Sequence, residues 1–272
     1  MQDITVRQMD FDFPERMDPV IIPGDPEQSY GTIGLSLLLP YLEPYLIRTM
    51  KQAKKQIRDP ELLSNLEKFS AQEGQHYRQH IRFNDAVRSF GFPGLEALEA
   101  ELDADYRRFS QTKPLEWNLA YAEGFEALTT AVAHFSMETG LEKLSHPAIR
   151  DLLTWHMVEE LEHRTVAFDV YQHVHGRYLY RLVWGTWAQW HMARWIGRAA
   201  EYMLQTDPRS DTEFGGAAGR KARQIERRKA GKGLLPRILK IYTPWYTPHD
   251  IPMTEELKRL SARYTEMAVR TF

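Results

Sequence analysis

Two segments of this 272-residue chain place glutamate and histidine on the side of a helix that its apolar residues would bury. They are "FSAQEGQHYRQH", with Glu73, His76 and His80, and "WHMVEELEHRTVAF", with His156, Glu160 and His163. At 100° per residue, each trio falls within an arc of about 60°, in line with neighbouring apolar side chains. A buried, unpaired carboxylate costs several kcal/mol, so such helices require a core that supplies compensating charge.

Two further predicted helices each place a glutamate in an apolar stripe. Glu126 lies in line with Leu119 and Met137. Glu123 lies one turn earlier on the same helix, and Glu43 lies among leucines of the first predicted helix. The chain order is therefore Glu, Glu-x-x-His, Glu, Glu-x-x-His, which fits a four-helix bundle that holds two metal ions. Four carboxylates and two divalent cations together carry no net charge, and neutral histidines complete the ligand shell.

Ion pairing between inward glutamates and inward basic side chains is the structural alternative to a metal site. The neighbouring basic residues are Arg48, Lys68, Arg78 and Arg164. They mostly fall off the apolar faces, which favours the metal site. On the fourth predicted bundle helix, Glu162 points away from the apolar stripe and Glu159 sits at its edge. We expect both to be solvated or to support a ligand.

Helical periodicity dominates the chain, and no strand-like alternation of useful length is present. Helices are predicted over 29–57, 60–89, 95–109, 114–139 with a stop at Gly140, 147–175, 177–204 and 254–269. Pro40 and Pro44 interrupt the first of these, because an interior proline kinks or breaks a helix. Residues 207–233 are polar and look loose.

The predicted organisation is one domain with an appended arm and tail. Residues 1–28 are expected to form an extended N-terminal arm, 29–204 the helical bundle with a fifth helix, and 205–272 a polar linker and a helical C-terminal tail. A hydrophobic content of 43% with 12% aromatic residues is typical of a globular protein.

Composition excludes several classes of function. The absence of cysteine excludes disulfides, zinc-thiolate sites and iron–sulfur clusters. A formal net charge of −2 gives no general attraction to nucleic acid, and no nucleic-acid motif is recognisable. The N-terminus lacks the features of a secretory signal, and no apolar run is long enough to span a membrane, so a cytoplasmic protein is expected.

Two surface features bear on partners. A tryptophan-rich stripe on the fifth helix and a basic cluster over 217–240 could together contact a membrane surface, but ordinary packing and a solvated helix are favoured. The expected partners are a small-molecule substrate and, if the chain oligomerises, a second copy in a homodimer.

Over most of residues 30 to 255 the chain resembles the ferritin-like di-iron carboxylate superfamily. Its segments "QEGQHYRQH", "EALT", "WHMVEELEHRTVAFDV" and "YTPWYTPHD" are similar to a bacterial family described as predicted metal-dependent hydrolases. The resemblance implies an all-α, ferritin-like four-helix bundle with a dinuclear metal centre and additional C-terminal helices. It implies metal ligands at Glu43, Glu73, His76, Glu126, Glu160 and His163.

Four neighbouring residues are candidates for additional ligands or for supporting roles: His80, His156, Glu123 and Glu159. A kink at Pro44 would re-aim Glu43. On the helix that carries Glu126, Glu123 is the reserve candidate for a ligand.

Three functions follow from such a site. The first hypothesis is a di-iron oxidoreductase that activates O2 to oxidise an organic, apolar substrate and takes electrons from an external donor. The alternatives are a hydrolase that uses a metal-activated water and a non-catalytic metal-binding bundle. Oxygen and imidazole ligands suit Fe, Mn or Zn alike. The four-carboxylate set favours iron or manganese over zinc, so Fe is expected first, with Mn or Zn as the other candidates.

Overall fold

The computed structural model describes residues 4–139, 141 and 143–272, and the regular secondary structure of these residues is almost entirely helical. The bundle and its covering helices are α1 (Pro26–Ala53), α2 (Pro60–Arg88), α3 (Leu95–Thr112), α4 (Leu115–Thr139), α5 (Pro147–His163), α6 (Val166–Val174) and α7 (Tyr178–Thr206). The C-terminal region adds α8 (Arg209–Thr212), α9 (Gly216–Ala230), α10 (Leu234–Ile241) and α11 (Glu255–Met267). The predicted all-α fold is confirmed; the predicted stop at Gly140 lies outside the described residues.

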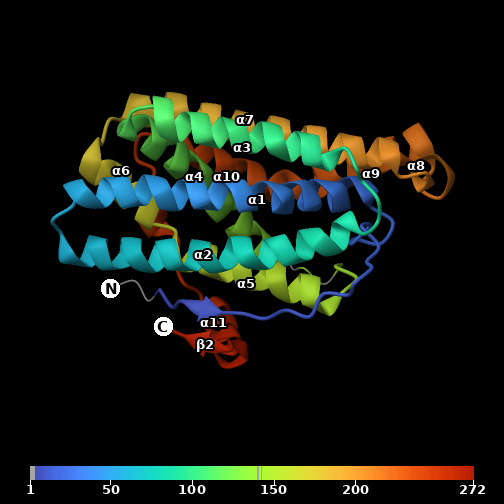
Figure 1. Ribbon diagram of the computed structural model, residues 1–272, viewed down its shortest axis with the longest axis horizontal. Coiled ribbons are helices and arrows are strands. Elements are labelled where there is room, and N and C mark those ends of the chain that lie inside the picture. Colours follow the sequence, from blue (N-terminus) through green and yellow to red (C-terminus); the bar gives the residue numbers. More distant parts are fainter. Residues whose placement is uncertain (1–3, 140, 142) are drawn as a thin grey trace.

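Four helices form the bundle that holds the inward glutamates. α1 packs on α2, α4 packs on α5, and contacts between α1 and α4 and between α2 and α5 close the ring. α7 lies along α1 and α4, with α3 beside it, on one side of the molecule. On the other side lie the N-terminal arm and α11, joined by the short antiparallel strands β1 (Arg7–Gln8) and β2 (Arg270–Thr271) (Figure 1).

Three of the four bundle helices, α1, α2 and α5, begin at a capping residue followed by proline. Asp25 accepts a hydrogen bond from the Gln28 amide at the start of α1, and Asp59 accepts one from the Leu62 amide at the start of α2. Pro26 and Pro60 follow these caps, where the missing N–H is not needed and the fixed φ suits a helix. These local signals fix where each of these helices starts and therefore its register.

The prolines inside α1 do not interrupt it, contrary to the sequence prediction. Pro40 cannot donate to the carbonyl of Ser36, four residues earlier. Instead, Asn84 Nδ2 on α2 donates to that carbonyl at 2.9 Å. The interhelical bond satisfies the freed acceptor and ties α1 to α2. Glu43 remains fully buried on the bundle side of α1, so Pro44 does not displace it.

Two predicted segments differ from the structure. The helix predicted over 147–175 is divided into α5 and α6, because the Arg164 guanidinium donates to the carbonyl of Leu161 and ends α5 just after His163. Residues 207–233, predicted to be loose, contain the helix α9. Arg223 and Arg227 of α9 form ion pairs with Glu27, which anchor that helix to the start of α1.

α7 approaches the bundle closely because both facing residues are glycine. A Cβ on Gly124 of α4 would lie 2.4 Å from the Cα of Gly185 on α7, so position 124 does not tolerate a side chain without a shift of the backbone. The tryptophan-rich stripe of α7 packs inward, with Trp187 stacked on His191 at a ring-centroid distance of 5.2 Å.

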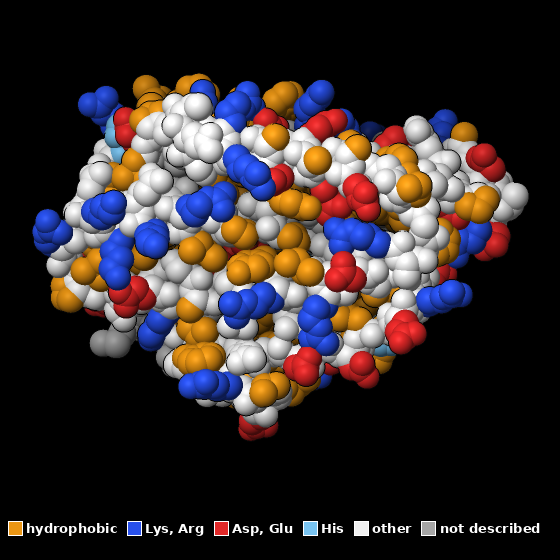
Figure 2. Space-filling model, viewed as in Figure 1, with side chains coloured by type: hydrophobic (Ala, Val, Ile, Leu, Met, Phe, Trp, Pro, Cys, Tyr) orange, Lys and Arg blue, Asp and Glu red, His pale blue; other side chains and the backbone are white. Residues whose placement is uncertain are grey.

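The surface carries mixed charge. On the face shown in Figure 2, basic and acidic side chains are interspersed among hydrophobic ones, in keeping with the formal net charge of −2. Within the described residues, no helix has both the length and the apolar character needed to cross a bilayer.

Candidate metal centre

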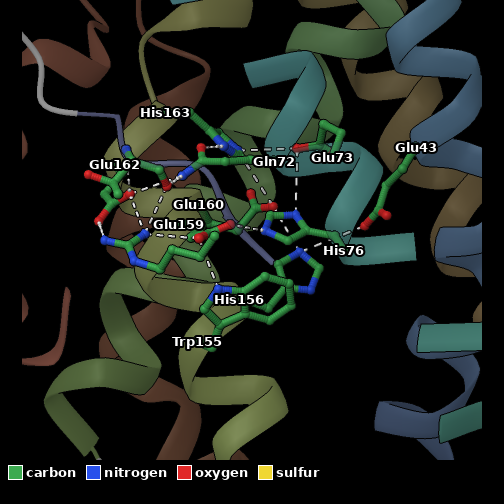
Figure 3. Close-up of polar contacts among 12 residues, drawn as sticks. Glu43, Gln72, Glu73, His76, Trp155, His156, Glu159, Glu160, Glu162 and His163 are labelled. Atoms are coloured by element: carbon green, nitrogen blue, oxygen red, sulfur yellow. Dashed lines mark hydrogen bonds and ion pairs between the residues drawn. The ribbon is translucent and has the colours of Figure 1, made fainter. Parts of the chain in front are cut away.

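Six of the residues singled out by the sequence converge in the middle of the bundle, and several are drawn in Figure 3. α1 supplies one, α2 two, α4 one and α5 two; they are Glu43, Glu73, His76, Glu126, Glu160 and His163. None is more than 3% exposed. We call Glu43, Glu73, Glu126 and Glu160 the central carboxylates.

The donor atoms form three overlapping groups, and the atoms within each lie within 4.8 Å of one another. The groups are Glu43, His76 and His156; Glu73, Glu126 and His163; and Glu73, His76 and Glu160. Together they contain all six predicted ligands and add His156.

The spacing around His163 fits ligands of one metal ion. His163 Nε2 lies 3.4 Å from Glu73 Oε1 and 3.4 Å from Glu126 Oε2. Two ligand atoms that each stand about 2.0–2.2 Å from a metal lie roughly 3.0–3.4 Å apart. The atoms are therefore close enough to share a cation.

Many of the converging atoms lack a hydrogen-bond partner. Among the described residues, both carboxylate oxygens of Glu43, Glu73 and Glu126 are buried without one, as are His76 Nδ1 and His163 Nε2. Buried polar groups in native proteins are nearly always satisfied. Metal ions would satisfy all of these atoms at once, so the residues present fit a metal centre.

Without metal, the central carboxylates depend on protons for neutrality. Burial, followed by the charges of Glu160 and Glu126, raises the pKa of Glu43 well above its ordinary value. Burial and the nearby Glu43 and Glu126 raise the pKa of Glu73 in the same way. Burial and Glu160 raise the pKa of Glu126 to about 7. Metal binding would therefore displace protons from this site.

Glu160 and His163 form the charged pair of the metal-free site. Burial disfavours both charges, but the imidazolium of His163 holds the pKa of Glu160 well below its usual range. In return, Glu160 and then Glu126 hold the pKa of His163 above its usual range despite burial. The charge of the imidazolium thus offsets that of Glu160 when no metal is bound.

The two histidines of the Glu-x-x-His segments are oriented through their other ring nitrogens. His76 Nε2 lies 2.9 Å from Glu159 Oε2, which leaves Nδ1 facing Glu73 at 3.8 Å. His163 Nδ1 lies 2.9 Å from Gln72 Oε1, which leaves Nε2 facing the carboxylates. Metal-binding histidines generally make this kind of supporting hydrogen bond.

Arg7 from the N-terminal arm holds both supporting groups. Its guanidinium contacts Glu159 at 2.9 Å and Glu162 at 2.8 Å, and Arg7 is completely buried. Glu162 also accepts a hydrogen bond from Gln72 at 2.9 Å. Arg7 is thus linked to His76 through Glu159 and to His163 through Glu162 and Gln72.

Of the two expectations for Glu159 and Glu162, support of a ligand is the one the structure fits, because Glu159 contacts His76 and Glu162 reaches His163 through Gln72. Neither is solvated, since the arm folds over this side of α5 and buries both. The sequence analysis missed Arg7, which lies in an arm without helical periodicity. It also missed Gln72, although that residue lies one turn before His76 and shares its face.

A chain of hydrogen bonds leads from the central carboxylates into α1. His156 Nε2 lies 3.0 Å from Glu160 Oε1, and His156 Nδ1 lies 2.8 Å from His80 Nε2. His80 Nδ1 then lies 2.7 Å from Ser36 Oγ, which donates to Asn84 Oδ1. His80 therefore supports His156 and does not reach the central carboxylates.

Glu123 is turned away from the centre. Its carboxylate forms an ion pair with Arg181 of α7 at 2.9 Å, and both side chains are buried. Since Glu126 of the same helix lies with Glu73 and His163, the reserve role considered for Glu123 is not needed.

The fold and the site define an all-α metal-binding protein whose donors are glutamate and histidine side chains from four helices. The chain belongs to the family of predicted metal-dependent hydrolases, whose model matches residues 5–251. No curated protein matches the chain, and no solved structure matches it. The family favours the hydrolase hypothesis over oxidation by O2, which the sequence analysis had placed first.

Proposed function

We propose that the protein is a hydrolase that uses two divalent metal ions. The proposed ligands are the six converging residues Glu43, Glu73, His76, Glu126, Glu160 and His163. The observation that carries the proposal is the convergence of buried oxygen and nitrogen atoms that have no hydrogen-bond partner. Membership of the hydrolase family supports the class of reaction.

The metals and the protein have separate tasks. When bound, two divalent cations supply Lewis-acid chemistry: they acidify water and polarise a carbonyl or phosphoryl oxygen. The protein fixes the donors. Glu159 and Gln72 set the ring orientations of His76 and His163, and Arg7 restrains both supporting side chains. Such restraint keeps the donor geometry constant.

His156 is placed to move a proton. Its Nε2 faces Glu160 Oε1, and its Nδ1 faces His80, which continues to Ser36. A proton released at the Glu160 end can pass to His156 and be returned to a leaving group. Removing this path should lower kcat more than it lowers metal content.

Aromatic side chains keep bulk water out of the centre. The ring of Phe69 lies 4.8 Å from that of His163, and the ring of Trp155 lies 4.9 Å from that of His76, centroid to centroid. Both aromatic residues are fully buried. Electrostatic interactions with a substrate are stronger in such a site than in water.

The experiment that tests the proposal follows the oxygen atom. Metal-loaded protein is incubated with candidate esters in 18O-labelled water, with and without O2. Hydrolysis predicts label from water in the acid product and an unchanged rate without O2. The Glu73→Gln variant should be inactive, whereas Glu123→Gln, which alters a buried glutamate outside the centre, should retain activity if folded. No turnover by the metal-loaded protein, or turnover unaffected by Glu73→Gln, would contradict the proposal.

Oxidation by O2 remains a second candidate because of the donor set. Four carboxylates and two histidines form the kind of set that holds two iron or manganese ions in helical bundles. In the same experiment, this function predicts a strict requirement for O2 and for a reductant, and no label from water in a hydroxylated product. A parallel incubation with 18O2 in ordinary water should label that product.

A further inference from the structure

A cavity of about 230 Å³ lies inside the bundle beside the central carboxylates. Its walls come from α1, α2, α4, α5 and α7, and Glu160 and His156 are among its lining residues. The cavity approaches the surface near α7, where the lining residue Ala193 is exposed. It therefore offers a space that adjoins both the proposed metal centre and the exterior.

Most of the wall is apolar. Representative wall residues are Leu39, Phe125, Val132, Leu153, Met157 and Met192. Among the described residues that line the cavity there is no lysine or arginine. The walls therefore provide no cationic side chain to recognise a phosphate or a carboxylate.

The polar side chains of the cavity are already hydrogen-bonded to one another or to backbone. Thr129 Oγ1 donates to Glu160 Oε2 at 2.8 Å, and His156 contacts Glu160 at 3.0 Å. Ser36 contacts His80, and Thr32 donates to the carbonyl of Gln28. A polar ligand group placed along the walls would lose its bonds to water without replacement.

A much larger cleft, of about 1200 Å³, lies along α11 and the end of α5. It is lined mainly by polar and charged side chains, including Asp169, His173 and Lys258, and by none of the six proposed ligands. Although this cleft is larger, a substrate bound in it would not contact the central carboxylates, because none of them lines it. A substrate bound in the smaller cavity can have its reacting bond beside the central carboxylates, because Glu160 lines that cavity.

We infer that this cavity binds the aliphatic acyl group of an uncharged ester, with the ester carbonyl at the Glu160 end. An apolar cavity of about 150 Å³ holds a six-carbon ring, so the present volume accommodates roughly six to nine carbons. The inference rests on the proposed function for the identity of the reacting bond. The selectivity for an apolar chain rests on the cavity alone.

The reaction at the cavity end is a hydrolysis. The bond between the acyl carbon and the alcohol oxygen breaks, and the oxygen of water forms a new bond to the acyl carbon. One proton of that water goes to the departing alcohol, and the products are an acid and an alcohol. No oxidant or reductant is consumed.

Binding is tested first, without metal and without turnover. Calorimetric titration of the metal-free protein with primary alcohols from ethanol to 1-dodecanol should give the lowest Kd near 1-hexanol to 1-octanol. Val132→Phe, which fills the cavity, should raise that Kd at least tenfold. Val183→Phe is the matched control, because Val183 is 57% exposed on α7 and does not line the cavity.

A second variant covers the case in which Val132→Phe does not fold. Val132→Ala enlarges the cavity and should move the preferred chain to longer alcohols, an effect that simple destabilisation cannot produce. Binding that shows no dependence on chain length in the wild type, or the same length preference in Val132→Ala and wild type, would overturn the inference.

Turnover is then measured with p-nitrophenyl acetate, hexanoate, octanoate and laurate on metal-loaded protein. The inference predicts the highest kcat/KM for hexanoate and octanoate. Selective alcohol binding without hydrolysis of any ester would overturn the proposed reaction and leave the apolar cavity established. Hydrolysis with no preference for chain length, equally in Val132→Phe and Val183→Phe, would overturn the cavity assignment and leave the hydrolase proposal intact.

Discussion

Buried glutamates are neutralised in two different ways on the same helix of this protein. On one side of α5, Glu159 and Glu162 share the guanidinium of Arg7. On the other side, Glu160 joins the central carboxylates, which have no lysine or arginine partner among the described residues. The fold can therefore place an arginine against buried carboxylates. That no arginine or lysine in the described part of the chain pairs with the central carboxylates is a specific feature of the candidate metal centre.

The Arg7 cluster, which consists of Arg7, Glu159 and Glu162, also has the composition expected of a permanent structural group. It carries one guanidinium for two carboxylates, and burial, followed by the charge of Glu162, raises the pKa of Glu159 to about 8. The guanidinium of Arg7 gives this cluster a permanent positive charge, because, despite burial, contacts with Glu162 and Glu159 raise its pKa. The central carboxylates reach neutrality only by binding protons or metal.

The largest expected effect is the loss of Arg7. Arg7→Met leaves Glu159 and Glu162 buried without a cation, which should lower the free energy of unfolding by about 3–5 kcal/mol. Urea denaturation of the metal-free protein measures this change. Arg82→Met is the control. It removes an exposed ion pair with Asp10 and should lower the free energy of unfolding by less than about 1 kcal/mol. Equal effects of the two substitutions would mean that the Arg7 cluster is not a structural requirement.

The second prediction contrasts two buried glutamates. Glu123→Gln leaves Arg181 without its anion and should lower the free energy of unfolding of the metal-free protein by about 3 kcal/mol. Burial and the neighbouring carboxylates raise the pKa of Glu73, so Glu73→Gln replaces a protonated carboxyl with a neutral amide of similar shape, and the same free energy should stay within about 1 kcal/mol. Urea denaturation of both metal-free variants measures this difference. A loss of unfolding free energy in Glu73→Gln as large as in Glu123→Gln would contradict the prediction.

The third prediction concerns the support of His163. Gln72→Leu removes the hydrogen bond to His163 Nδ1 and should weaken metal binding by about 10- to 100-fold. Competition with a coloured chelator gives the affinity. Gln79→Leu is the control, since Gln79 is buried on the same helix but bonds the arm at Met9. Metal affinity lowered equally in both variants would show that only general destabilisation is involved.

The smallest expected effect is the response of the metal-free protein to pH. Carboxyl groups with raised pKa values bind more protons in the folded state than in the unfolded state, so stability should rise as pH falls through those values. The pKa of Glu126 near 7 by itself contributes about 1 kcal/mol to this gain between pH 8 and pH 6, and the raised pKa of Glu159 acts in the same direction. Metal-loaded protein should show no such gain, because protons compete with the metal. Thermal or urea unfolding at several pH values in the presence of a chelator tests this sign.

Much of the fold was accessible from sequence because its determinants are local. Helical periodicity, caps and prolines predicted the bundle helices, and the inward Glu-x-x-His segments identified the residues that converge. The continuity of α1 through Pro40 was not accessible, since it depends on Asn84, 48 positions away from Ser36. Arg7 was missed for the same reason: its partners lie more than 150 residues along the chain.

The central claim is that the four central carboxylates are made tolerable by two cations. The most direct test is the metal content of the chain after reconstitution of metal-free protein with Fe²⁺, Mn²⁺ or Zn²⁺ and gel filtration, measured by plasma mass spectrometry. The account predicts two equivalents of at least one of these metals per chain, with Glu73→Gln losing metal and Glu123→Gln retaining it. A wild-type chain that retains none of the three metals, or a Glu73→Gln variant that retains the full amount, would contradict it.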